Sequence, residues 1–115
     1  MTTPYKRGRY AEWAVRDLLR KAGWLVMRSY ASKGPYDLVA VHRDHDTALI
    51  QVKASRQKMP TIGAASPAER IALWQTAEQV GGDAIVACYH QGKVKYHKLA
   101  GRGAGEWDYW SPDAL

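Results

Sequence analysis

The chain of 115 residues has one cysteine, no apolar run long enough to cross a bilayer, and fewer acidic than basic side chains. A single cysteine excludes a disulfide framework within the chain and is typical of a reducing compartment. Cys88 stands in the apolar run 84–89, so we expect a small core residue rather than a nucleophile or metal ligand. The first nine residues contain no apolar signal core. We therefore expect a soluble, cytoplasmic protein without a membrane partner.

Histidine clusters and internal repeats are also missing. The four histidines, at positions 42, 45, 90 and 97, stand singly, without partners at the spacing of a zinc site. The length of 115 residues and the hydrophobic content of 46% favour one domain with a real core and argue against disorder. We predict a single domain over 1–115, with its core at about 6–99 and an aromatic tail at 100–115.

The charge balance is basic, with 17 Lys and Arg against 11 Asp and Glu, for a formal net charge of +6. Such a balance favours a polyanionic partner, and nucleic acid is the first candidate. The alternative is a generally basic surface that only keeps the protein soluble. Clustering of the cations favours nucleic acid, and the clusters are Lys6, Arg7 and Arg9; Arg28 and Lys33; Arg56 and Lys58; and Lys93, Lys95 and Lys98.

Two segments have the marks of helices. Thr3 followed by Pro4 suits a helix start, and Gly23 suits its end. Between them a stripe of apolar residues recurs at helical spacing and is expected to be buried, namely Ala11, Val15, Leu18, Leu19 and Ala22. Glu12 lies beside this stripe, where its carboxylate reaches the edge of the core or simply pairs with Arg16 one turn later.

The second helix has clearer start and stop signals. Ser66-Pro67-Ala68-Glu69 is a capping box with proline in the first turn, and Gly81-Gly82 ends the helix. Its predicted buried stripe consists of Leu73, Ala77 and Val80, with Ile71 and Trp74 nearby.

Five segments are predicted as strands: 24–29, 37–42, 48–53, 84–89 and 93–99. The resulting order is αβββαββ. The fold class is therefore α/β, a small domain with a mixed central β-sheet of about five strands flanked by helices. We expect the aromatic residues of the tail to pack against this body or a second subunit.

The two strands at 37–42 and 48–53 carry the candidate site. Gly34-Pro35 precedes the first strand, which opens with Asp37, and Gln51 and Lys53 share one face of the second. If the turn leaves Arg43 opposite Thr47, Asp37 lies opposite Lys53 and Val39 opposite Gln51. That register is a hypothesis, because the turn chemistry does not determine it and a slip of one residue would scatter the patch.

The residue types suit phosphodiester hydrolysis. Magnesium prefers oxygen ligands, and Asp37 and Glu12 offer carboxylates while the Val52 backbone carbonyl offers another oxygen. Gln51 contributes a neutral amide oxygen. Lys53 suits activation of water or stabilisation of developing charge. The alternative is a solvated sheet edge where Asp37 and Lys53 form a cross-strand ion pair.

These residues and their order resemble the PD-(D/E)XK nuclease superfamily and, within it, the archaeal-type Holliday-junction resolvases. The resemblance rests on Gly8 with Glu12, on Gly34-Pro35-Tyr36-Asp37 and on Gln51-Val52-Lys53, and it covers about residues 6–99. It implies a restriction-endonuclease-like fold and a homodimer that nicks opposed strands of four-way DNA junctions. It also implies Mg²⁺, with Mn²⁺ as a substitute, and a phage or archaeal source would suit it.

The resemblance further assigns roles to individual residues. Glu12, Asp37 and Gln51 would hold the metal, Lys53 would be catalytic, and Ser32 would act near the scissile phosphate. The resemblance implies that Arg9, Arg28 and Lys33 contact the DNA backbone. The clustering of basic residues adds Lys6, Arg7, Arg56 and Lys58 to the predicted DNA-binding set. Gln51 departs from the acid that the superfamily usually carries at its position.

Two alternative functions stay open. One is a repair or nicking endonuclease of the same superfamily without junction selectivity. The other is a DNA-binding protein in which Gln51 has silenced the chemistry.

Overall fold

The computed structural model describes residues 4–29, 34–101 and 105–113, with side chains from Gly8 onward. The described residues form two helices, six strands and a short 3-10 turn: α1 (Pro4–Lys21), β1 (Leu25–Arg28), β2 (Leu38–His42), β3 (His45–Ala54), η2 (Ile62–Ala64), α2 (Pro67–Val80), β4 (Asp83–His90), β5 (Lys93–Leu99) and β6 (Trp107–Tyr109). The predicted order αβββαββ is confirmed, and β6 is an additional strand that the sequence pattern did not predict.

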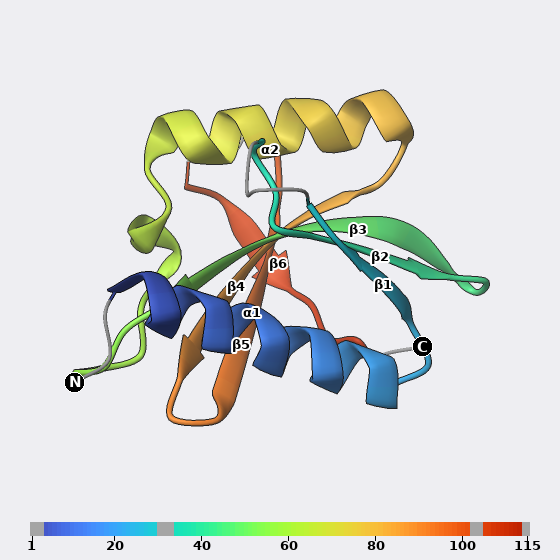
Figure 1. Ribbon diagram of the computed structural model, residues 1–115. Helices are drawn as coiled ribbons and strands as arrows, with labels where there is room; N and C mark the ends of the chain where they lie inside the picture. The colour runs from blue at the N-terminus through green and yellow to red at the C-terminus, as the bar shows by residue number, and fades with distance from the viewer. Residues whose placement is uncertain (1–3, 30–33, 102–104, 114–115) are drawn as a thin grey trace.

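The six strands form one mixed sheet in the order β1-β2-β3-β4-β5-β6. Neighbouring strands are antiparallel, except that β3 and β4 are parallel. Parallel neighbours require a crossover, and α2 provides it. Figure 1 shows α2 along one side of the sheet and α1 along the other, so the central strands lie between two helical layers. The prediction of an α/β domain with a mixed sheet is confirmed.

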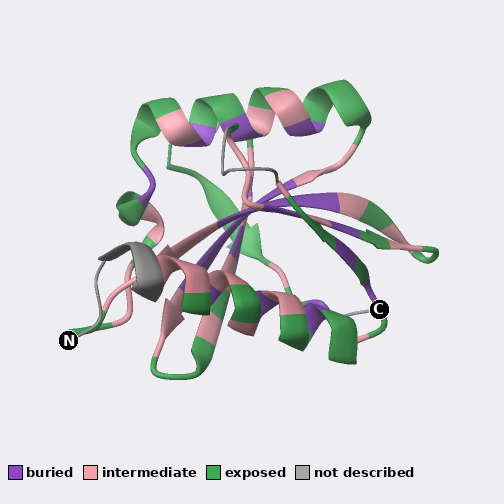
Figure 2. Cartoon of the chain, viewed as in Figure 1, coloured by how far each residue is buried: buried purple, intermediate pink, exposed green. Residues whose placement is uncertain are grey.

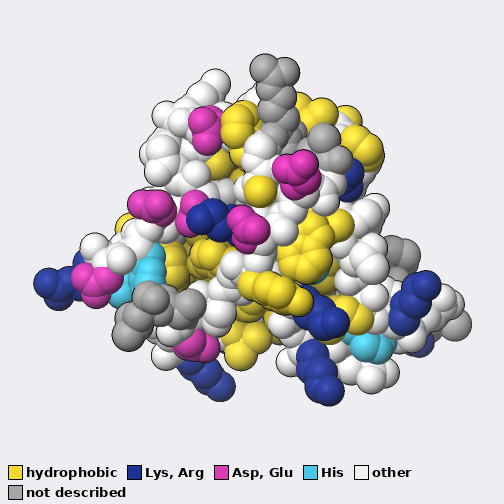
Figure 3. All heavy atoms as spheres, turned by 180° about the vertical axis from the view of Figure 1, so that it is seen from behind, with side chains coloured by type: hydrophobic (Ala, Val, Ile, Leu, Met, Phe, Trp, Pro, Cys, Tyr) yellow, Lys and Arg dark blue, Asp and Glu magenta, His cyan; other side chains and the backbone are white. Residues whose placement is uncertain are grey.

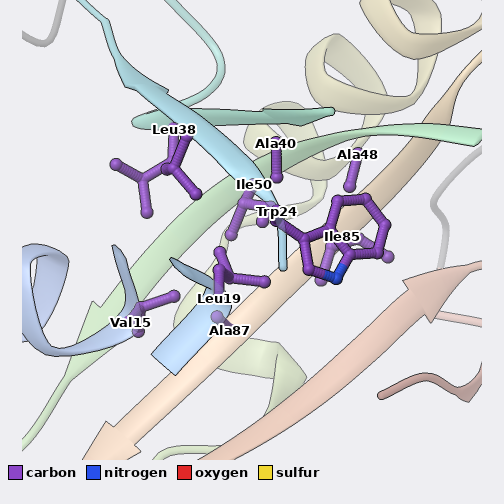
Figure 4. Close-up of a cluster of buried hydrophobic side chains, with 10 residues drawn as sticks. Val15, Leu19, Trp24, Leu38, Ala40, Ala48, Ile50, Ile85 and Ala87 are labelled. Carbon is purple, nitrogen blue, oxygen red and sulfur yellow. The ribbon is translucent and has the colours of Figure 1, made fainter. Parts of the chain in front are cut away.

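Two apolar clusters occupy the two faces of the sheet. Val15 and Leu19 of α1 pack with Ala48 and Ile50 of β3 on one face, and Figure 4 shows this cluster in close-up. Leu73 of α2 and its neighbours cover Leu49 and Val86 on the other face. Because β3 and β4 are covered on both sides, their centres are continuously buried (Figure 2).

Parts of the predicted helix stripes are exposed. Leu18 is 40% exposed in α1, and Val80 and Ile71 are 59% and 37% exposed in α2. The sheet contacts a narrower strip of each helix than the periodicity suggested, and Val80 is the last residue of α2. The expectation that Leu18 and Val80 belong to the buried stripes was therefore wrong, and Ile71, predicted only to lie near the stripe, is exposed as well. Ala11, Val15, Leu19, Leu73 and Ala77 are buried as predicted.

The register between β2 and β3 differs from the hypothesis. Val39 lies opposite Leu49 and Leu38 opposite Ile50, two residues away from the expected pairing of Val39 with Gln51. The turn is tighter than expected because β3 already begins at His45. A shift of two residues leaves each side chain on its predicted face, because strand side chains alternate with a period of two. Asp37, Gln51 and Lys53 therefore still share one face of the sheet, although their cross-strand partners differ from those expected.

The start of α2 has the predicted capping box. The Glu69 amide donates to Ser66 Oγ at 3.1 Å, and the Ser66 amide donates to Glu69 Oε1 at 2.9 Å. Gly81 ends the helix in the left-handed region with φ of 69°. These two bonds stabilise the helix end that faces the candidate site.

The C-terminal segment packs partly onto the body of the domain. The Trp24 indole N–H donates to the Pro112 carbonyl oxygen at 3.0 Å in a buried position, and Trp110 packs against Trp24 and Tyr96. Tyr109, in contrast, is 91% exposed at the edge strand. Packing of the aromatic tail against the body is thus confirmed for Trp110. Cys88 is fully buried, as expected. Among the described residues, neither helix is long and apolar enough to cross a membrane.

We expect Gly82→Ala to destabilise the fold, because a Cβ at this position would lie 2.4 Å from the Thr47 carbonyl oxygen of β3. Neither backbone yields without disturbing the connection from α2 to β4, so the expected loss is roughly 1–3 kcal/mol. Gly8→Ala is the matched control, because its Cβ would meet no atom within 4 Å. In a helix interior it should gain about 0.5–1 kcal/mol. Urea denaturation of both variants measures the difference, and equal effects would contradict this account of Gly82.

Candidate active site

The site lies where β3 continues beyond the end of β2. The last paired residues are Leu38 and Ile50, and β3 runs on to Ala54. The Asp37 amide still donates to the Ile50 carbonyl oxygen at 2.8 Å. The Asp37 side chain then takes the place of the missing strand, since its Oδ2 accepts the Val52 amide at 2.8 Å. The open edge of β3 thereby positions the carboxylate.

Gln51 and Lys53 share the face of β3 that α2 covers. Gln51 Nε2 and Lys53 Nζ each donate to Glu69 Oε2 at 2.9 Å. Lys53 therefore pairs with Glu69 and not with Asp37, which contradicts the cross-strand ion pair considered as an alternative. The Lys53 contact is the largest cause that lowers the pKa of Glu69 to about 2. Glu69 is thus ionised throughout the neutral range.

Glu12 approaches the same region from α1. Its Oε1 accepts from Arg28 Nε at 3.2 Å, and its side chain is only 12% exposed. The alternative pairing with Arg16 is not formed, because the Arg16 guanidinium contacts Asp17 instead. The charges of Glu12 and Arg28 both shift the pKa of Asp37. The structure thus brings Glu12, Asp37, Gln51 and Lys53 together, as the sequence predicted.

Burial raises the pKa of Asp37 above its ordinary value of 3.8, and the neighbouring Glu12 charge raises it further. The hydrogen bond from the Val52 amide and the charges of Lys53 and Arg28 oppose this rise but do not cancel it. A carboxylate that is desolvated beside a second carboxylate is stabilised by a cation.

The remaining oxygen atoms fit a divalent cation. Gln51 is 8% exposed, and its Oε1 is buried without a hydrogen-bond partner among the described residues. The N–H and C=O of one strand residue point to the same neighbouring strand, so the Val52 carbonyl lies on the Asp37 side of β3. Oxygen ligands of these kinds suit a hard cation. The described residues contain no group of three or more His, Cys, Asp or Glu arranged to hold a metal, so the amide and carbonyl oxygens are needed to complete the set.

The basic residues predicted to contact DNA are only partly visible. Ser32 and Lys33 lie outside the described residues, as do the side chains of Lys6 and Arg7. Arg28 is held by Glu12 at the site, and the Arg9 guanidinium lies over the Trp13 ring at 5.6 Å. Arg56 and Lys58 are exposed in the loop after β3.

Glu69 is the site residue that sequence reasoning missed. The sequence assigned it only to the capping box, where it does lie. The signal that could have revealed it is the neutral Gln51: an amide in place of an acid suggests a search for a carboxylate elsewhere. The packing of α2 over β3 brings Glu69 into contact with Gln51 and Lys53, which no local pattern in the sequence indicates.

The fold and the oxygen-rich edge of β3 together define a class: a small α/β domain of the restriction-endonuclease-like type. The chain belongs to the archaeal Holliday junction resolvase (Hjc) family, whose sequence profile matches residues 3–112. Membership places it among the Holliday junction resolvases, which are nucleases that act on DNA.

A solved structure supports the fold. Hjc of Archaeoglobus fulgidus, a Holliday junction resolvase from an archaeal hyperthermophile, superposes with a TM-score of 0.66 at 22% sequence identity. The superposition covers 83% of this chain and 79% of that one. No curated protein matches the chain significantly.

We expect Asp37→Asn to stabilise the metal-free protein at neutral pH. The folded-state pKa of Asp37 lies above its unfolded value, so ionisation opposes folding, and the penalty grows as pH rises through the raised pKa. Asparagine still accepts the Val52 amide but carries no charge. Thermal melts in a chelator should show the variant more stable at pH 7 and equal to wild type below pH 3.8, the ordinary value. A variant less stable than wild type at pH 7 would contradict the raised pKa.

Proposed function

We propose that the chain is a magnesium-dependent endonuclease that nicks opposed strands of four-way DNA junctions as a homodimer. The observation that carries the proposal is the convergence of Glu12, Asp37 and Gln51 at the end of β3, with Lys53 beside them and a Gln51 oxygen that has no hydrogen-bond partner in the described part of the chain. Mg²⁺, or Mn²⁺ in its place, would be held by Glu12, Asp37, Gln51 and the Val52 carbonyl. A cation bound there neutralises phosphate charge and polarises a water molecule.

The other side chains of the site have separate roles in the proposed reaction. The Val52 amide holds Asp37 in place through one carboxylate oxygen, and the other oxygen would bind the metal. Glu69 orients the Lys53 ammonium group, which suits charge stabilisation at the scissile phosphate. Ser32 would contribute beside that phosphate.

The DNA-contacting surface would surround this edge. Arg28 stands at the site, and Arg9 lies on α1 one turn before Glu12. Arg56 and Lys58 follow the motif strand, and Lys6, Arg7 and Lys33 complete the proposed set. Gly8 adds a position on α1 where a phosphate backbone can approach closely, because no side chain projects from it.

A homodimer follows from the reaction, because opposed cuts in a symmetric junction require two sites related by a two-fold axis. The sequence suggested the aromatic tail as one candidate contact surface. The structure offers a further candidate, an apolar patch on the β1–β2 face made of Leu25, Met27 and Val41, exposed by 65%, 48% and 36%. Figure 3, which views the molecule from behind, shows hydrophobic side chains exposed at several places on that face.

The decisive experiment is Mg²⁺-dependent cleavage of a labelled four-way junction beside a linear duplex of matching arm sequence. We expect paired symmetric cuts in the junction alone. Asp37→Asn and Lys53→Ala should each lower the cutting rate by roughly 10²–10³-fold or more. The first removes the carboxylate charge that would hold the metal, and the second removes the positive charge beside the reacting phosphate. Asp46→Asn and Lys21→Ala are matched controls at exposed positions away from the site and should cut like wild type.

Each other outcome selects an alternative. Equal cutting of both substrates would replace junction resolution by a general nicking activity. Tight, salt-sensitive junction binding without cuts would indicate a silent DNA-binding protein. Unchanged cutting by both site variants would reject the assigned residues.

Dimerisation is tested separately by sedimentation of variants at the apolar patch. Met27→Lys in combination with Leu25→Lys should shift the protein to monomer at working concentrations, because charges would be buried in the contact. Junction binding should weaken along with it, and metal binding should not. Tyr109→Lys is the control for the aromatic tail: dissociation by this variant alone would move the contact surface to β6.

A further inference from the structure

The structure assigns a positioning role at the active site to Glu69 of α2, and we propose that Gln51 and Glu69 act as one unit that replaces the acid expected at position 51. Glu69 supplies the negative charge, and Gln51 supplies the oxygen that faces a divalent cation. The inference rests on the proposed metal-dependent function and identifies a further residue on which that function depends.

The first support is the geometry of the Glu69 carboxylate. Its Oε2 accepts from both Gln51 Nε2 and Lys53 Nζ at 2.9 Å, and its Oε1 accepts the Ser66 amide at 2.9 Å. The capping box therefore anchors one oxygen and leaves the other for the two motif residues of β3. A single side chain orients both.

The second support is the orientation of the Gln51 amide. An ionised carboxylate accepts hydrogen bonds but donates none, so only the NH₂ group of Gln51 can face Glu69. Its Oε1 must then point the other way, and this atom is buried without a partner among the described residues. A buried oxygen without a partner is costly unless a ligand satisfies it. Glu69 thus holds a neutral oxygen ready for a cation.

The third support concerns what an acid at position 51 would meet. Gln51 is buried, and the Glu69 oxygen lies at hydrogen-bond distance from its amide nitrogen. A glutamate there would place a buried carboxylate against the partly exposed Glu69 carboxylate, and the two like charges would repel each other. Restoring the common acid by itself should therefore disturb the site, and Gln51 and Glu69 should tolerate exchange of their groups only together.

A double-mutant cycle tests the unit with Gln51→Glu, Glu69→Gln and both combined. Glutamine is also acceptable at the third position of a capping box, so Glu69→Gln should preserve α2. The readouts are thermal stability without metal and the affinity for Mn²⁺ by calorimetry, neither of which requires cleavage. Glu78→Gln, an exposed change on the same helix, is the matched control.

We expect Glu69→Gln to weaken Mn²⁺ binding by roughly 10–100-fold, the size typical of residues that orient metal ligands. Gln51→Glu alone should lower the metal-free melting temperature. The double variant should recover most of both losses. A Glu69→Gln protein with wild-type Mn²⁺ affinity, or effects that simply add, would overturn the proposal.

Failure of the proposed function gives a different result. A wild type that binds Mn²⁺ with the expected coupling but cuts no junction would reject the nuclease reading and leave the Gln51–Glu69 unit standing. A Glu69→Gln variant that loses stability without losing Mn²⁺ affinity would reduce Glu69 to its capping role and overturn the inference. The Gln51→Glu variant retains the native capping box. Its stability therefore tests the repulsion between a glutamate at position 51 and Glu69, even if Glu69→Gln fails to fold.

Discussion

The arrangement of the site depends on one hydrogen bond, from the Val52 amide to the Asp37 carboxylate. It forms because β2 stops pairing at Leu38 while β3 continues, so the backbone groups of β3 beyond Ile50 need another partner. The Asp37 side chain accepts the Val52 amide in place of a strand backbone. The same bond brings a carboxylate into a partly desolvated position beside the half-buried end of β3.

Burial of the polar groups in this region costs folding free energy. Asp37 is desolvated and lies in the field of Glu12, so its pKa is raised, and the Gln51 carbonyl oxygen is buried without a partner among the described residues. Both features oppose folding of the metal-free chain, and the proposed cation would relieve both. Rigid elements hold these buried polar groups in place, since α1, β3 and α2 each belong to a packed apolar cluster. Sites of this kind commonly trade stability for chemistry.

Charge at the site is distributed over elements far apart in sequence. Glu12 and Arg28 pair between α1 and β1, while Lys53 and Glu69 pair between β3 and α2. Glu12 and Glu69 thus each have a cation close by, and the second pair directs the ammonium group of Lys53. This pairing also means that the basic surface alone does not describe the site, because Arg28 serves Glu12 as well as facing the proposed DNA.

The sequence by itself determined the elements and the faces. Local signals at Ser66, Glu69 and Gly81 define α2, and the period of two puts Gln51 and Lys53 on one face whatever the register. The motif residues Asp37, Gln51 and Lys53 were therefore predictable, and so was the mixed α/β sheet. Tertiary structure alone decided the pairing of β2 with β3, the addition of β6, the exposure of Leu18 and the partnership of Glu69 with Gln51. The physical reason is that these features depend on contacts between segments distant in the chain, and local propensity carries no information about which distant atoms will meet.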